Sequence, residues 1–430
     1  MTHPAALRRL VVLLSGVARI AQAVSLPTWQ ALASKVPSAA AARPITTDWL
    51  IGPQASFSDE RPTLFRERNG WCPYSARVWL ALEYKGVDYE TVKVDAGRFD
   101  GRPAGLSGAT PQLRWPDGTL MEGSIDIIEA LDVWQPANPL CRPANVAWTE
   151  VQELTRACES TFPGVQLKDG EPLRLRGMAS AFEEAMEFTD QLLCRHLNGP
   201  FFCGTQLSIV DVVWAPFLER YEAWLPLTFP GLCIRDASRW PHLCRWFEAM
   251  EAQPIWACHL RGDGASWSKV LASSPGWLVL PTRACSPPRR SADAMRGRAE
   301  ATAVLWQAYA AGRPYVASTP QIELAAHFLR NHQLLVTDIT AATGAAPERA
   351  DAHLRALAWL LTSPDGDAGP SQDMLSMLVS PSVPSMPQES LRATAEYLEE
   401  RVCVPRDVCA PAATALSRLT SQILQCYFTV

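Results

Sequence analysis

The side chain best placed to act as a nucleophile in this sequence is the thiol of Cys72, in the run WCPYS at 71–75. A strand-like run at 63–66 precedes it, and a helical pattern of apolar residues extends from Pro73 to Lys85. Cys72 is therefore expected at a strand-to-helix turn, where unpaired backbone N–H groups and the helix dipole favour a thiolate. Because the thiolate is the reactive form, the pattern predicts a reactive cysteine. The alternative is a buried, unreactive apolar cysteine.

The segments after Cys72 alternate in a recognisable order. Strands are expected at 89–94, 110–115 and 119–121, and the Pro-Asp-Gly at 116–118 is a hairpin turn signal between the last two. A helix over 124–134 should follow, capped by its first residue, a serine. The order is thus βαβ followed by ββα.

This order, with a cysteine opening the first helix and a Thr-Pro pair opening the third strand, resembles the thioredoxin-like domain of the glutathione transferase superfamily. Cys-Pro-Tyr-Ser is most similar to the cysteine-dependent branch, the omega and dehydroascorbate-reductase-type enzymes, which exchange thiols. The resemblance covers roughly residues 60 to 260. A second motif lies in the expected place downstream, because Ser208 and Asp211 form a capping box that opens a long helix. We expect these two residues to serve folding and not chemistry.

The resemblance implies a role for each residue of the first motif. Cys72 would form a mixed disulfide with glutathione, Thr110 would pair through its main chain with the cysteinyl part, and Pro111 matches the family's cis-proline. Ser124 would bind the γ-glutamyl carboxylate at a helix N-terminus. The usual Glu-Ser pair reads Gly123-Ser124 here, so the accompanying carboxylate is missing or shifted. Without a ligand, the same residues would serve strand entry and helix capping.

Ser75 occupies the place where a dithiol enzyme has its resolving cysteine, which implies a monothiol mechanism. A second glutathione would then release the first from Cys72. Tyr74 would be a wall of the glutathione pocket or a packing residue. Arg77 would offset the thiolate charge, or it would be a solvent-exposed arginine without a role at the site.

The implied function is a glutathione-dependent thiol transferase or reductase of the dehydroascorbate-reductase type. Its co-substrate would be glutathione, its acceptor a small molecule or a protein disulfide, and the family commonly forms homodimers. A non-catalytic scaffold or interaction protein with the transferase fold is a second possibility, favoured by Gly123 and the long C-terminal tail. Conjugation of glutathione to electrophiles is a weaker third possibility, since a thiolate in that place would attack the glutathione sulfur or the electrophile itself.

Composition narrows the function classes. The chain has 430 residues and a net charge of -5. No basic patch interleaved with aromatic residues indicates nucleic-acid binding, and no apolar run approaches the roughly 20 residues that span a bilayer. The 12 cysteines include no Cys-x-x-Cys pair, which is typical of a reducing compartment. The seven histidines form no pattern of metal ligands, so we expect no metal.

The sequence predicts five parts. An α/β thioredoxin-like domain with a mixed four-stranded sheet is expected at 60–140 and an all-helical domain at 145–262. A Pro- and Ser-rich linker at 263–290 leads to an additional helical extension of unknown role at 291–430. Residues 1–44 contain five basic residues and no acidic one, so 1–46 resembles a transit peptide for the chloroplast or mitochondrion. Without such import, the protein is expected in the cytoplasm.

Overall fold

A computed structural model of the chain describes residues 26–41, 45–47, 57–67, 69–94, 107, 109–140, 164–168, 171–176, 178–195, 198–229, 231–262, 267, 302–363, 388–401 and 408–428. The chain forms two compact units. The central unit comprises Arg43–Ala311 and Val402–Ala413, and the terminal unit comprises Met1–Ala42, Gly312–Arg401 and Thr414–Val430. Each is described by itself.

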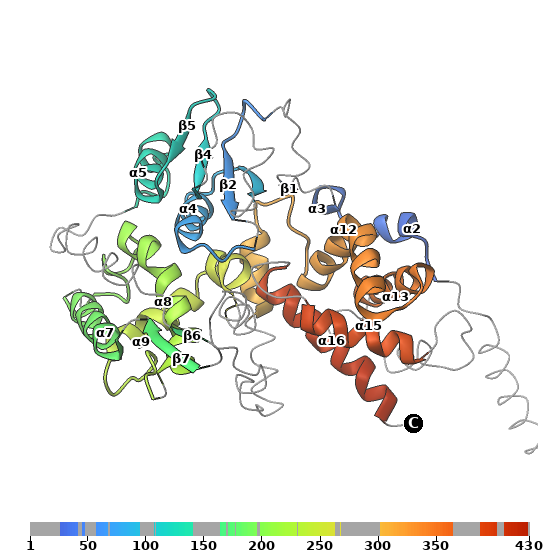
Figure 1. Cartoon of the computed structure of the whole chain (residues 1–430). Helices are drawn as coiled ribbons and strands as arrows, with labels where there is room; N and C mark the ends of the chain where they lie inside the picture. Colours follow the sequence, from blue (N-terminus) through green and yellow to red (C-terminus); the bar gives the residue numbers. More distant parts are fainter. Residues whose placement is uncertain are drawn as a thin grey trace, which may run out of the picture. The chain divides into compact units, whose positions relative to one another are not determined.

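The central unit contains a mixed five-stranded sheet in the order β1-β3-β2-β4-β5 (Figure 1). The strands are β1 (Ile45–Thr47), β2 (Thr63–Glu67), β3 (Glu90–Val94), β4 (Gln112–Arg114) and β5 (Leu120–Glu122). β3 runs parallel to β1 and β2, whereas β4 is antiparallel to β2 and β5. The four predicted strands and the thioredoxin-like order are confirmed. β1 is an additional edge strand that the pattern did not predict.

Helices α4 (Pro73–Tyr84) and α5 (Ser124–Trp134) pack against each other beside this sheet (Figure 1). Alternation along the strands divides the side chains between two faces. Leu64 of β2 and Leu113 of β4 belong to the main core with residues of both helices, whereas Phe65 belongs to a smaller cluster with Val92 and Val94. The first face therefore fixes α4, and with it Cys72, against the sheet.

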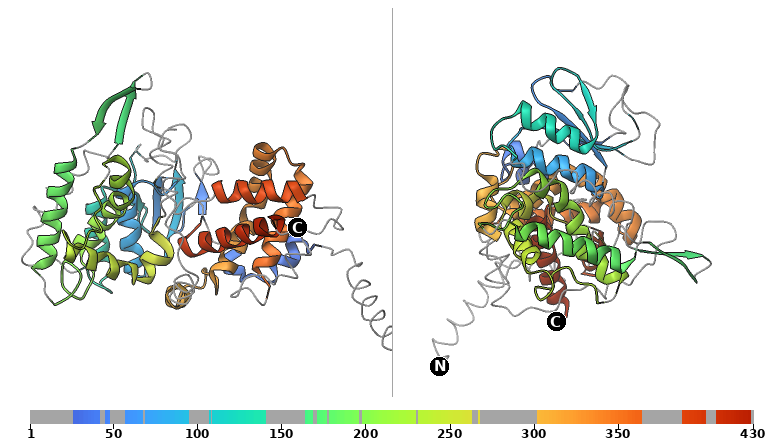
Figure 2. Two further views of the ribbon diagram at one scale, coloured as in Figure 1. Left: turned by 90° about the horizontal axis from the view of Figure 1, so that it is seen from below. Right: turned by 90° about the vertical axis from the view of Figure 1, so that its left-hand side faces the viewer.

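The rest of the central unit is mostly helical, with α7 (Ala179–Cys194), α8 (Ile209–Thr228), α9 (Pro241–Glu251) and a π-helix, η2 (Trp256–Leu260). The expectation of a purely helical pattern from 145 onward was wrong at one place. β6 (Gly164–Lys168) and β7 (Glu171–Arg176) form an antiparallel hairpin that projects from the helices (Figure 2). Apolar residues alternate in both strands, and the sequence between them is Asp-Gly, a hairpin signal that was overlooked. Of the all-helical domain predicted at 145–262, residues 145–163 lie outside the described residues.

The capping box predicted at the start of α8 is present. Asp211 accepts hydrogen bonds from the backbone N–H of Ser208 at 2.8 Å and from its hydroxyl at 2.6 Å. Its other oxygen accepts a bond from the indole N–H of Trp246, 2.7 Å away on α9. The motif therefore fixes the first turn of a buried helix and also joins it to the next one.

The terminal unit consists of helices from both ends of the chain. They are α2 (Trp29–Ala33), α3 (Ser38–Ala41), α12 (Pro320–Thr343), α13 (Pro347–Leu361), α15 (Gln388–Arg401) and most of α16 (Ala410–Phe428). α12 begins at the Thr319 cap and ends at Gly344, whose φ of 72° suits a residue without a side chain. It contacts α2, α3, α13 and α15. The predicted helical extension after residue 291 is therefore confirmed in the described helices α12, α13, α15 and α16.

Residues of the predicted leader form part of this helical unit. The indole N–H of Trp29 donates to Asp351 at 2.7 Å, and its ring stacks on His332 with the centroids 4.7 Å apart. Arg355 donates to the carbonyl of Pro27 at 3.2 Å, and Leu32 is completely buried. The segment 26–41 is thus an integral part of a folded unit. A leader stays a prediction for residues 1–25, which lie outside the described residues.

Among the described residues, none of the helices is both long and apolar enough to cross a bilayer. The predicted linker at 263–290 lies outside these residues, except for Trp267, whose side chain is buried.

Candidate functional site

Cys72 lies at the predicted strand-to-helix turn, as the N-cap residue of α4 with Pro73 in the first helical turn. Its carbonyl accepts the hydrogen bond from the N–H of Ala76 at 3.1 Å, whereas its side chain makes no capping bond. The thiol is partly buried and lies 3.7 Å from the carbonyl oxygen of Thr110. The sulfur is therefore held beside the first turn of a helix, where free N–H groups and the dipole favour negative charge.

Thr110 and Pro111 reach Cys72 from a distant part of the sequence. The Thr110–Pro111 peptide bond is cis, as the resemblance implies. Pro111 is buried and leads directly into β4, which pairs with β2 just before the Cys72 turn. The sheet thus positions the Thr110 main chain opposite the thiol.

The loop that enters the Cys72 turn is held from two sides. The carboxylate of Glu67 accepts hydrogen bonds from the N–H groups of Asn69, at 2.7 Å, and Trp71, at 2.8 Å. The guanidinium of Arg220, on α8, donates to the carbonyl oxygen of Trp71 from Nε at 3.1 Å and from Nη2 at 2.9 Å. The residue immediately before Cys72 is therefore fixed through both its N–H and its carbonyl.

Ser124 is the first residue of α5 and is buried, near the start of α4. Arg77 contacts its hydroxyl, with Nη1 and Oγ 3.4 Å apart, and donates from Nε to the carbonyl of Val213 at 2.8 Å. The guanidinium of Arg77 also lies over the rings of Tyr74, at 5.1 Å, and Phe217, at 4.6 Å. Arg77 is therefore a buried bridge from α4 to α5 and α8, so the solvated alternative was wrong. Tyr74 packs against the Arg77 guanidinium.

Gly123 has a φ of 87°, a conformation that L side chains rarely adopt. A Cβ at this position would lie only 2.8 Å from a carboxylate oxygen of Asp126, in the first turn of α5. Glu122 does not replace the missing carboxylate, since its side chain accepts a hydrogen bond from Gln112 at 3.0 Å, across the β4–β5 pair. The carboxylate of Asp126 therefore lies beside the Gly123 turn, whereas that of Glu122 is engaged with Gln112.

Ser75 lies in the first turn of α4 and is 1% exposed. Its hydroxyl makes no hydrogen bond with any described residue. A serine hydroxyl cannot form a disulfide with Cys72, so this turn holds a single thiol.

The sequence pattern predicted neither Arg220 nor the buried state of Arg77. Arg220 is separated from Trp71 by 149 positions, so no local motif links them. The available signal was an arginine within a mostly apolar helix, α8. A cation in such a setting needs a buried partner.

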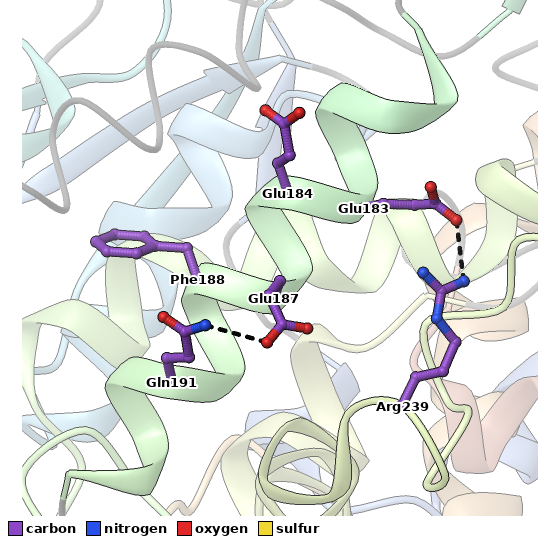
Figure 3. Close-up of a pocket in the computed structure, with 6 residues that line it drawn as sticks. All are labelled: Glu183, Glu184, Glu187, Phe188, Gln191 and Arg239. Carbon is purple, nitrogen blue, oxygen red and sulfur yellow. Dashed lines mark hydrogen bonds and ion pairs between the residues drawn. The ribbon is translucent and has the colours of Figure 1, made fainter.

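An open pocket of about 420 Å³ lies elsewhere in the central unit (Figure 3). It is lined on α7 by Glu183, Glu184, Glu187, Phe188 and Gln191, and by Arg239. Arg239 is paired with Glu183 at 2.9 Å, so the remaining glutamates leave the pocket acidic. It contains none of the predicted site residues and suits an anionic tripeptide poorly.

Among the described residues of the central unit, Cys72, Cys194, Cys233, Cys244 and Cys258 are free thiols. Burial raises the pKa of the Cys258 thiol to about 12, which leaves that thiol uncharged at neutral pH. The described part of the chain holds no group of three or more His, Cys, Asp or Glu residues that could bind a metal ion.

Comparison with known proteins matches two families to the central unit. The family described as "Glutathione S-transferase, N-terminal domain" matches residues 71–133, and "Glutathione S-transferase, C-terminal domain" matches residues 172–249. Glutathione S-transferase L3 of Arabidopsis thaliana is 30% identical over 185 residues, which cover 41% of this chain and 73% of that protein.

Two further matches have names of the dehydroascorbate-reductase type. Probable glutathione S-transferase DHAR1, cytosolic, of Oryza sativa subsp. japonica is 30% identical over 166 residues, covering 36% of this chain and 72% of that protein. The crystal structure of Chlamydomonas reinhardtii dehydroascorbate reductase matches with a TM-score of 0.42 and 22% identity, over 50% of this chain and 99% of that one.

Proposed function

Because the chain belongs to the glutathione S-transferase superfamily, we propose that it is a glutathione-dependent thiol transferase in which Cys72 forms a mixed disulfide with glutathione. The observation that carries this proposal is the position of the Cys72 sulfur, at the start of α4 and 3.7 Å from the Thr110 carbonyl. A thiol so placed has a helix N-terminus to stabilise its anion and an adjacent extended backbone to align a peptide. Both are needed for thiol exchange with a peptide thiol.

The glutathione would bind along this edge of the sheet. The main chain of Thr110 would pair with its cysteinyl residue, and Ser124 with the α5 N-terminus would hold the γ-glutamyl carboxylate. That carboxylate is adjacent to an ammonium group, which requires a negative partner. We assign this role to Asp126, because its carboxylate lies beside the Gly123 turn and Glu122 is engaged with Gln112.

The reaction takes place in two exchanges. In the first, the Cys72 thiolate attacks the glutathione sulfur of a mixed disulfide, the Cys72–glutathione bond forms, and the acceptor leaves as a thiolate that takes up a proton. In the second, a glutathione thiolate attacks the glutathione sulfur bound to Cys72, which gives oxidised glutathione and restores the Cys72 thiolate. Over the two steps, the mixed disulfide and one reduced glutathione become the acceptor thiol and oxidised glutathione, so the acceptor sulfur is reduced and the sulfur of the incoming glutathione is oxidised. Ser75 cannot intervene, so the intermediate persists until the second glutathione arrives.

The acceptor would be a small molecule or a protein disulfide. Dehydroascorbate is a small-molecule candidate that is not a disulfide, and its reduction to ascorbate would take two electrons from two reduced glutathiones, which become oxidised glutathione. A homodimer, as is common in the family, stays a prediction, as does import into an organelle.

The first test is incubation of the full chain with oxidised glutathione, followed by intact mass and peptide mapping. We expect a single glutathione on Cys72, removed by excess reduced glutathione, and none at that position in Cys72→Ser. Cys258, which is buried with a raised pKa, is an internal control that should stay unmodified.

An unmodified Cys72, or equal labelling of many cysteines, would refute the enzymatic proposal. The protein would then be better explained as a scaffold with the transferase fold. Two features favour that second function. One is Gly123, and the other is the terminal unit, whose residues lie outside the ranges that the two families match.

A further inference from the structure

Arg220 is a buried cation that no sequence motif identifies. Its side chain is 1% exposed, and it makes four hydrogen bonds, all to backbone carbonyls. Two reach Trp71, a third reaches Gly70 at 3.4 Å, and the fourth reaches Pro216, one turn earlier on α8. The guanidinium thus joins the core of the helical domain to the two residues that precede Cys72.

Burial of a cation is costly unless charges and hydrogen bonds compensate it. The carboxylate of Glu219, the adjacent residue on α8, lies 3.5 Å from Nη1, and the ring of Trp267 covers the guanidinium at 4.2 Å. Burial lowers the pKa of Arg220, while negative charge on Glu219, Cys72 and Glu67 opposes that shift. The Arg220 guanidinium therefore lies close enough to Cys72 for a charge on either group to affect the other.

Glu67 and Arg220 hold the loop before Cys72 through different backbone groups. Glu67 binds the N–H groups of Asn69 and Trp71, and Arg220 binds the carbonyls of Gly70 and Trp71. The backbone just before the cysteine is therefore held through both its N–H and its carbonyl groups. A loop so held keeps the sulfur at the helix N-terminus and does not have to be ordered when a substrate binds.

We propose that Arg220 is a positioning residue for Cys72, which fixes the Gly70–Trp71 backbone and supplies a buried positive charge that favours the ionised thiol. The proposal rests on the proposed function only in taking Cys72 as the reacting group. Glu219 is the counter-ion in this arrangement. Burial raises the pKa of Glu219 to about 7 against the charges of Arg220 and Arg261, and Glu222 adds to the rise.

The test is the pH dependence of Cys72 alkylation by iodoacetamide, measured on the full chain by peptide mapping so that other cysteines do not interfere. In Arg220→Gln we expect the pH of half-maximal rate to rise by about one unit, the size of shift that loss of one nearby opposite charge produces. Arg220→Lys, which keeps the charge, should recover most of this shift. Arg239→Gln removes an arginine that pairs with Glu183 on the surface and should leave the profile unchanged.

A folded Arg220→Gln protein, verified by circular dichroism, with the wild-type profile would overturn the proposal. If Arg220→Gln does not fold, Glu219→Gln provides the test. Loss of this counter-ion should move the pH profile of Cys72 alkylation to lower pH. An unchanged profile would refute the role of Arg220. The reagent is not glutathione, so the two proposals fail separately. A wild-type Cys72 that alkylates but takes up no glutathione refutes the transferase function and leaves Arg220 in its role.

Discussion

At the scale of single residues, the Gly123 turn determines which carboxylate lies beside the proposed glutathione site. A Cβ atom on residue 123 would lie only 2.8 Å from a carboxylate oxygen of Asp126. A glutamate at position 123 would therefore require the Asp126 side chain to move. The backbone φ of 87° further favours glycine. In the proposed site, the carboxylate beside the γ-glutamyl group would therefore be that of Asp126, in the first turn of α5.

This arrangement predicts that Asp126→Asn weakens glutathione binding by about tenfold, since a hydrogen bond to a charged group contributes about 1.5 kcal/mol. Isothermal titration with reduced glutathione in a Cys72→Ser background measures the effect without covalent adducts. Glu122→Gln is the matched control, because Glu122 is bound to Gln112 and should leave Kd unchanged. Equal losses in both variants, or none in Asp126→Asn, would remove Asp126 from the site.

At the scale of elements, α8 begins with a carboxylate that is completely buried. Burial raises the pKa of Asp211 from 3.8 to about 6, although hydrogen bonds from Ser208, Trp246 and Phe202 favour its ionised form. Because the folded-state pKa exceeds the unfolded one, Asp211 contributes stability below about pH 3.8, and this contribution is lost as the pH rises through about 6.

Ser208→Ala should therefore destabilise the central unit in a pH-dependent manner. Loss of the cap costs about 1 to 2 kcal/mol of unfolding free energy. The cost should be larger at pH 8, where the hydroxyl binds an ionised carboxylate, than at pH 5, where Asp211 is mostly protonated. Urea denaturation at the two pH values measures it.

The control for this prediction is Thr319→Ala, at the N-cap of α12. The Thr319 side chain accepts a bond from the N–H of Ile322 at 3.2 Å and contacts no carboxylate in a capping box. Its cost should be the same at both pH values. A Ser208→Ala cost that is likewise independent of pH would contradict the account of Asp211.

The elements also show how far sequence reasoning reaches. The order of strands β2 to β5, the Cys72 turn and the α8 capping box were all predictable, because each depends on residues within a few positions of one another. The roles of Arg77 and Arg220 were not predictable, because these arginines contact residues that are 136 and 149 positions away in the sequence. Edge strand β1 was missed for the same reason: only its pairing with β3 makes Ile45–Thr47 a strand.

At the scale of the whole molecule, the terminal unit depends on its N-terminal segment. Trp29→Ala removes the bond to Asp351 and the stacking on His332, and we expect it to lower the unfolding free energy of this unit by about 3 kcal/mol. Urea denaturation measures that loss, while glutathione capture by Cys72, in the central unit, should be unaffected.

Trp134→Ala is the comparison for this variant, because Trp134 is 47% exposed, lies in the central unit and should cost less than about 1 kcal/mol. A Trp29→Ala protein as stable as the wild type would show that α2 does not support the terminal unit. If α2 does support the terminal unit, cleavage of a leader after residue 46 would remove both α2 and α3 and so destabilise that unit.

The two-ended composition of the terminal unit has a consequence for synthesis on the ribosome. Residues 26–41 emerge before the central unit, yet the helices that bury Leu32 and Ala40 are translated only after Arg43–Ala311 has been completed. Domains generally fold as units during synthesis, so the central unit would fold while the N-terminal segment still lacks its partner. The nascent chain therefore carries an unsatisfied apolar segment for most of its translation, and that segment would be open to chaperones until α12 emerges.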